Sequence, residues 1–157
     1  MAGTKVAYVK PHGALYHAVV HHLEQADAVI DAVRRYDPSM HVLGLPGSAL
    51  LRSADLAGLT PVAEAFADRA CSASGALVSR REAGAVLHDV KVVTHRVVRI
   101  AARAEIVADD GSVVPTPARS LCVHGDSPGA VVMATAVRRR LVDAVIEISP
   151  FVPGGGG

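Results

Sequence analysis

Short apolar segments alternate with longer amphipathic segments along the 157-residue chain. The apolar segments are rich in Val, Leu and Ala and are bounded by Gly, Pro, Asp or Ser, which is typical of buried strands. The predicted strands cover 5–9, 41–45, 60–66, 120–123 and 144–148. Asp109-Asp110-Gly111-Ser112 is a turn signal and predicts a hairpin between two further short strands.

Amphipathic helices are predicted between these strands, over 16–36, 48–56, 82–102 and from Ser127 onward. In the first helix Leu23, Ala26, Ile30 and Val33 recur at helical spacing, and Pro38 stops it. Segment 82–102 is rich in valine, which favours strands, but its valine spacing favours a helix. Ser48 is expected to cap the second helix, and Ser127, followed by proline, the last one.

The alternation of strands and helices predicts an α/β fold with a parallel sheet, either open or closed into a barrel. Half of the residues are hydrophobic but only 3% are aromatic, so the core is expected to consist of Val, Leu, Ile and Ala. This composition is that of a folded chain rather than a disordered one.

The charge balance excludes some classes of protein. Sixteen basic and fifteen acidic residues leave a formal charge of +1, unlike the basic footprint of a nucleic-acid-binding protein.

No apolar run is long enough to span a membrane, and the first residues lack a signal-peptide pattern. Cys71 and Cys122 lie far apart without metal-site spacing, so a reduced, cytoplasmic protein is expected.

Polar residues follow three of the predicted strands: Lys10, His12 and Tyr16; Glu64, Asp68 and Arg69; and His124 and Asp126. Because the carboxyl ends of parallel strands meet at one edge of a sheet, we expect these side chains to share one pocket. Each residue also has a structural explanation. Asp126 could cap a helix, Arg69 could pair with a neighbouring acid, and His17 and His21 suit a solvated helix face better than a metal site.

Four motifs at these positions resemble the LamB/YcsF family, which comprises the A subunits of 5-oxoprolinase. They are VKPHGALY at 9–16, EAFADR at 64–69, GALVSR at 75–80 and SLCVHGDSPGA at 120–130. The chain departs from the family pattern at His17, at Ala70-Cys71 and at Ser79.

The resemblance implies an α/β barrel of the glycoside hydrolase/deacetylase type that works with subunits B and C. It implies an ATP-dependent reaction that opens the lactam of 5-oxo-L-proline to give L-glutamate. We hypothesise proton-transfer or orienting roles for four residues: His12, Asp68, His124 and Asp126. Substrate-binding roles are expected for five others: Lys10, Tyr16, Glu64, Arg69 and Arg80.

A complete α/β barrel takes ~250 residues, so the resemblance implies a partial barrel that lacks its N-terminal β/α units. Residues 1–153 are expected to form this C-terminal part of the domain, and 154–157 a flexible glycine tail. Two alternatives remain open. The chain could be a non-catalytic piece that docks on the other subunits or on itself, or a metal-dependent deacetylase by analogy of fold. The metal content is not predicted.

Overall fold

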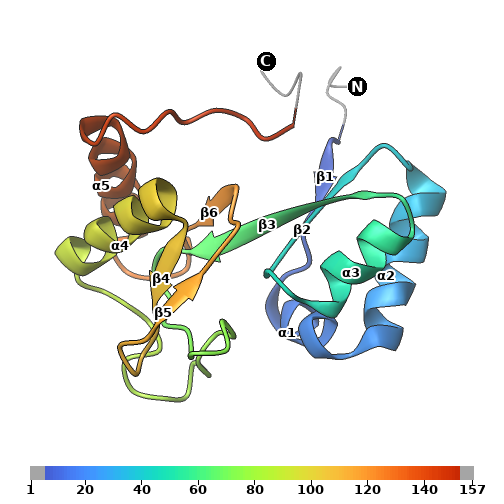
Figure 1. Cartoon of the computed structure of the whole chain (residues 1–157), viewed down its shortest axis with the longest axis horizontal. Helices are drawn as coiled ribbons and strands as arrows, with labels where there is room; N and C mark the ends of the chain where they lie inside the picture. The colour runs from blue at the N-terminus through green and yellow to red at the C-terminus, as the bar shows by residue number, and fades with distance from the viewer. Residues whose placement is uncertain (1–5, 153–157) are drawn as a thin grey trace. The chain divides into compact units, whose positions relative to one another are not determined.

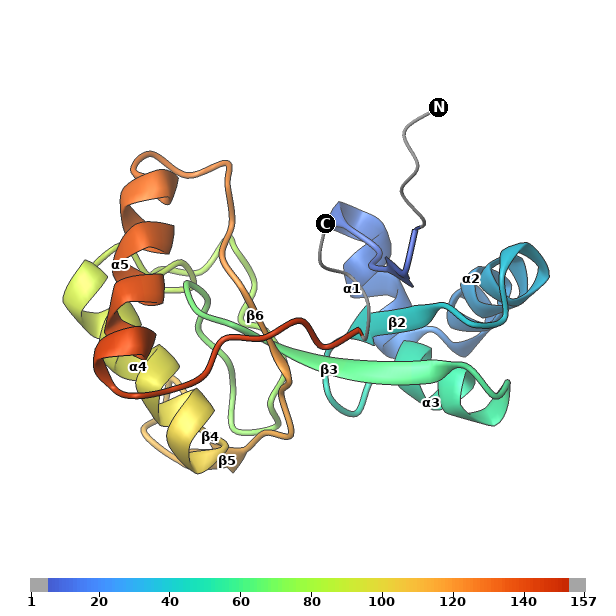
Figure 2. The same cartoon turned by 90° about the horizontal axis from the view of Figure 1, so that it is seen from above.

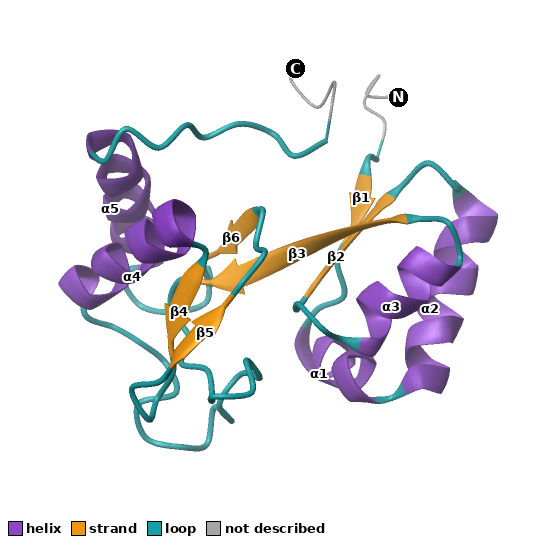
Figure 3. Cartoon of the chain, viewed as in Figure 1, coloured by secondary structure: helices purple, strands orange, loops and turns teal. Residues whose placement is uncertain are grey.

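A computed structural model describes residues 6–152, in two compact units. Unit 1 comprises the chain up to Glu64 together with the segment from Pro150, and unit 2 comprises Ala65–Ser149. The elements are labelled in Figure 1 and coloured by type in Figure 3. The predicted glycine tail at 154–157 lies outside the described residues.

Unit 1 contains three parallel strands and three helices. Strand β1 (Tyr8–Val9) pairs with β2 (His41–Gly44), and β2 pairs with β3 (Thr60–Phe66), which continues into unit 2. The helices are α1 (Gly13–His21), α2 (Leu23–Tyr36) and α3 (Ala49–Leu56). Helices α2 and α3 pack together, as Figure 1 shows. The core of this unit includes Val19, Ile30, Val42, Leu50 and Leu59.

Unit 2 holds the remaining elements. They are α4 (Val90–Arg103), β4 (Glu105–Val107), β5 (Val113–Pro115), β6 (Ser120–Cys122) and α5 (Ala130–Asp143). Strand β6 follows β3 in the sheet order β1-β2-β3-β6, and the Ala67 N–H donates to the Cys122 carbonyl at 2.9 Å. Helices α4 and α5 lie side by side, as both Figure 1 and Figure 2 show, and bury Val93, Val97 and Val137 between them and the strands.

Most of the predicted elements are confirmed. The 60–66 strand, the helix rather than strand at α4, and the antiparallel β4–β5 hairpin all form. Ser48 caps α3, since its hydroxyl accepts a hydrogen bond from the Leu51 N–H at 3.2 Å. The α/β class is therefore confirmed, and the parallel pairing of β1, β2 and β3 is what part of a β/α barrel requires.

Three predicted element boundaries and one predicted strand were wrong. The helix over 16–36 is two helices, because His22 adopts an extended conformation between them. The 82–102 helix begins only at Val90, where the Asp89 side chain caps it. Helix α5 begins at Ala130 after Gly129, not at Ser127. No strand forms at 144–148, because Val145 is left-handed at φ 59° and the Ile146 N–H bonds back to Leu141.

Candidate functional site

The centre of the candidate site is a buried carboxylate that holds an imidazole in unit 2. The Nδ1 atom of His124 lies 2.9 and 3.0 Å from the two carboxylate oxygens of Asp68. The main-chain N–H of His124 also donates to Asp68 Oδ2, at 3.0 Å. An ionised carboxylate only accepts hydrogen bonds, so Nδ1 carries the proton and Nε2 is left as the basic nitrogen.

The strands explain why these two residues meet. Asp68 follows the end of β3 and His124 follows the end of β6, and the Ala67–Cys122 hydrogen bond aligns the two strand ends. The ring of Phe66 stacks on the imidazole, with centroids 5.5 Å apart and planes 21° apart. The imidazole is therefore restrained by a hydrogen bond at its edge and by an aromatic ring on its face.

A cavity of about 200 Å³ adjoins this pair. Its polar lining comes from Asp68, His88, His124 and Ser127, and the start of α5 forms another part of the wall. Gly129 precedes α5 in a left-handed conformation, φ 80°, and no side chain of the described residues caps the helix. Main-chain N–H groups at a helix start attract negative charge, so this wall suits a carboxylate or a developing oxyanion.

Arg69 is buried and anchors the loop that follows β3. Its Nε donates to the Ala85 carbonyl at 3.2 Å, and its Nη2 donates to the Val78 carbonyl at 2.6 Å. Burial and the nearby Arg80 lower the pKa of Arg69, whereas Asp68 raises it. The guanidinium therefore holds backbone in place, and its expected role in binding the substrate carboxylate stays a prediction.

Asp126 and Arg80 form an exposed ion pair. Arg80 Nη1 lies 3.4 Å from Asp126 Oδ2, and both side chains are largely accessible to solvent. The hydrogen bond from its own main-chain N–H lowers the pKa of Asp126, and the side chain of Arg80 lowers it further. The pair places one cation and one anion in the same unit as the Asp68–His124 pair.

A second cluster lies in unit 1. Lys10 follows β1 and forms an ion pair with Glu64, which is only 1% exposed. The Lys10 ammonium also lies 5.9 Å from the centroid of the Tyr16 ring, a side chain that is itself buried. Oε1 of Glu64 has no hydrogen-bond partner among residues 6–152. A partly buried cation, a buried carboxylate and a buried phenol thus lie together.

The predicted residues therefore form two groups, one in each unit. Unit 2 brings Asp68 and His124 together and pairs Arg80 with Asp126, whereas unit 1 brings Lys10, Glu64 and Tyr16 together. His12 precedes α1 and is exposed. The single pocket expected for all of them stays a prediction.

The sequence analysis missed three residues of the unit 2 site, namely Phe66, His88 and Ser127. It assigned Phe66 only to the end of a strand. No local signal could have identified it, because the chain turns at Ala67-Asp68 after β3 and the partner of Phe66, His124, is distant in the sequence. Among the described residues, no three His, Cys, Asp or Glu side chains are grouped so as to hold a metal ion. No described helix is long and apolar enough to cross a membrane.

Comparison with known proteins supports the resemblance in the motifs. The model of the LamB/YcsF family matches residues 1–154. The chain is 54% identical over 150 residues to the A subunit of 5-oxoprolinase from Kocuria rhizophila, covering 96% of this chain and 60% of that protein. It is 53% identical over 150 residues to the one from Mycolicibacterium gilvum, with the same coverage.

A solved structure agrees with these matches. The crystal structure of the lactam utilization protein from Thermus thermophilus superposes with a TM-score of 0.89 at 37% identity, covering 95% of this chain and 59% of that one. The chain thus spans about 60% of the length of the curated relatives that it matches. The matches in sequence and structure together show that the chain belongs to the LamB/YcsF family.

Proposed function

We propose that this chain contributes the lactam-opening step of an ATP-dependent 5-oxoprolinase, which converts 5-oxo-L-proline to L-glutamate. The relatives' name, which makes them A subunits of 5-oxoprolinase, supports this substrate, and the Thermus thermophilus protein is named for lactam utilization. The single observation that carries the chemistry is the imidazole of His124 held on the buried carboxylate of Asp68.

In the proposed reaction His124 is the general base. Its Nε2 takes a proton from water while the water oxygen bonds to the lactam carbonyl carbon. The C–N bond of the ring then breaks, and the proton passes to the departing nitrogen, which becomes the amine of glutamate. Asp68 fixes the tautomer of the imidazole and stabilises its positive charge during this transfer. The start of α5 stabilises the negative charge of the phosphoryl group that ATP supplies to the carbonyl oxygen.

The other predicted residues take supporting roles in this proposal. Arg80 with Asp126 supplies a further charged contact. The substrate contacts expected of Lys10, Glu64 and Tyr16 in unit 1 stay a prediction. Arg69 positions the loop after β3 on which Arg80 lies. The proton-transfer role expected of His12, which lies before α1 in unit 1, likewise stays a prediction.

ATP is consumed by the complex in this proposal, because an amide is stabilised by resonance and phosphorylation of its oxygen activates the carbonyl carbon. The γ-phosphoryl group passes to the lactam oxygen and ADP leaves. After water adds and the ring C–N bond breaks, hydrolysis of the resulting acyl phosphate gives the glutamate carboxylate and inorganic phosphate. The relatives' name implies further subunits, and we propose subunits B and C as partners. A second candidate function is a non-catalytic assembly role on those subunits. The exposed valines at the start of α5, Val131 and Val132, favour it because they offer an apolar surface to a partner.

The decisive assay combines the chain with subunits B and C, ATP and 5-oxoproline, and measures L-glutamate release. We expect release that depends on all components and falls at least ~100-fold in His124→Gln. Arg138→Ala, an exposed change on α5, is the matched control and should release glutamate at the unchanged rate. Binding to the partner subunits without glutamate release would favour the assembly role. Metal analysis of the active complex tests the metal-dependent alternative.

A further inference from the structure

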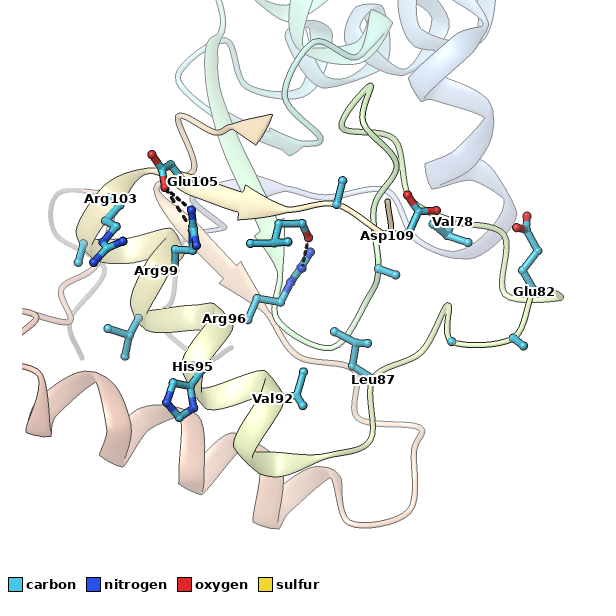
Figure 4. A pocket seen from close by; sticks show the side chains of 17 residues that line it. Val78, Glu82, Leu87, Val92, His95, Arg96, Arg99, Arg103, Glu105 and Asp109 are labelled. Carbon is cyan, nitrogen blue, oxygen red and sulfur yellow. Dashed lines mark hydrogen bonds and ion pairs between the residues drawn. The ribbon is translucent and has the colours of Figure 1, made fainter. Parts of the chain in front are cut away.

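A cavity of about 890 Å³ opens in unit 2, and none of the site residues discussed above lines it. It lies between α4, the strand β4 and the loop after β3 (Figure 4). Its volume is within the range of ~300–1,000 Å³ that is usual for pockets of small organic ligands. No side chain of residues 6–152 occupies this space.

One wall of the cavity carries three basic side chains together with the carboxylate of Glu105. His95, Arg99 and Arg103 follow each other at intervals of four residues along α4, so they form one row on the helix surface. Arg99 donates to Glu105 through Nε and Nη2, at 3.2 and 2.9 Å. The exposed Arg103 side chain forms no ion pair or hydrogen bond within residues 6–152. Arg103 is therefore the cation that is available to a ligand.

The opposite wall is anionic. Glu82 and Asp109 lie on the side of the cavity away from Arg103, as Figure 4 shows. The Glu82 side chain is exposed and has no side-chain partner in the described part of the chain. Asp109 accepts only the main-chain N–H of Asp110, at 2.9 Å. Two carboxylates on this wall thus face solvent without a cation to neutralise them.

The surface between the two walls carries Arg96 and several apolar side chains. Arg96 Nη1 donates to the Val107 carbonyl at 2.9 Å, so this guanidinium is already bonded to the main chain. The apolar side chains are Val78, Leu87, Val92, Val98 and Val107, and Val92 is 50% exposed. Exposed valines beside a concave surface lose water when a ligand covers them, which favours binding. The lining therefore combines an apolar floor with a cation at one end and anions at the other.

We infer that this cavity binds a short peptide with free ends. Its carboxylate pairs with Arg103, its ammonium group pairs with Glu82 and Asp109, and an apolar side chain lies on the valine floor. A single amino acid would leave most of the volume of about 890 Å³ empty, whereas a tripeptide carries its two charges on opposite ends of an apolar centre. This site is independent of the proposed lactam chemistry.

Isothermal titration calorimetry of the full chain with Ala-Leu-Ala tests the inference. We expect saturable binding that weakens roughly 10-fold or more when either peptide end is blocked, because each blocked end loses a charge-assisted hydrogen bond. The probes are Ala-Leu-Ala, its N-acetyl form and its C-terminal amide. Absence of binding, or equal binding of the three peptides, would overturn the inference.

Two variants test which cavity residue pairs with each end of the peptide. Arg103→Ala should weaken the free peptide to the level of the amide and leave the affinity for the amide unchanged. Glu82→Gln should weaken the free peptide part of the way to the level of the acetylated peptide, because Asp109 remains, and should leave the affinity for the acetylated peptide unchanged. Both positions are exposed, so both variants should keep the wild-type circular dichroism spectrum. Arg138→Ala does not line the cavity and is the matched control. Loss of affinity for all three peptides to the same extent in Arg103→Ala would contradict the assigned orientation.

Discussion

Asp68 receives two hydrogen bonds from His124, one from the main-chain N–H at 3.0 Å and one from Nδ1 at 2.9 Å. The same carboxylate thus holds both the backbone and the ring of one residue. Because Asp68 is buried, loss of either bond would leave a carboxylate oxygen that water cannot readily solvate. The arrangement fixes the direction in which Nε2 of His124 points.

Asp68→Asn should lower the turnover of 5-oxoproline by at least ~100-fold in the complex with subunits B and C. The amide has nearly the same shape as the carboxylate, but its NH₂ group favours the opposite imidazole tautomer and it cannot stabilise an imidazolium. Steady-state kinetics should show the loss in kcat with little change in KM. An unchanged kcat would reject the proton-transfer role of the pair.

Arg80→Ala should raise the pKa of Asp126 towards its ordinary value. The hydrogen bond from its own N–H remains in the variant, so we expect only part of the depression to be lost. A depressed carboxyl pKa stabilises the fold above the unfolded-state pKa, and this stabilisation is lost as the pH falls through the folded-state pKa. NMR titration of the Asp126 carboxyl between pH 2 and about 6 measures the change. A lower pKa in the variant would contradict the assignment of Arg80.

Lys10→Met should destabilise unit 1 by about 3 kcal/mol, because it leaves the carboxylate of Glu64 buried without its cation. Adding Glu64→Gln to this variant should restore much of the stability, since the uncompensated charge is then removed. Urea unfolding of the two variants and the wild type provides the comparison. If the double variant were no more stable than Lys10→Met, the ion pair would not be the cause.

Val97→Ala should cost about 2 kcal/mol of unfolding free energy in unit 2. Val97 is fully buried between α4 and α5, and the change removes two methyl groups and leaves a cavity. Val92→Ala on the same helix is the matched control, because Val92 is half exposed. Thermal unfolding should show a clear decrease in Tm for the first variant only. Equal effects would mean that α4 does not pack as described.

The sequence predicted the elements whose signals are local. The Val93, Val97 and Ile100 spacing identified α4 as a helix despite its valines, since burial of one face outweighs the weak strand preference of each residue. Position 48 was identified as a cap because serine accepts the N–H of the residue three positions later. The carboxyl ends of β3 and β6 correctly indicated where Asp68 and His124 lie.

What the sequence could not predict depends on contacts between distant segments. The break at His22 has no Pro or Gly to mark it, so nothing local separates α1 from α2. The 144–148 segment has strand-like residues, but strands need a partner for their N–H and C=O groups, and Val145 turns the chain away. The stacking of Phe66 on His124 joins residues 58 positions apart in the chain, a separation that no periodicity reveals.

The register of β3 on β2 limits where this chain can gain or lose residues. Leu43 lies opposite Val62, and Gly44 lies opposite Ala63. The residues that follow place Glu64 beside Lys10 and Asp68 beside His124. Inserting or deleting one residue within 60–66 would turn every later side chain of the strand to the other face. Variation in length among natural or engineered forms should therefore be confined to the exposed turn around Arg81–Gly84, while 60–69 changes by substitution alone.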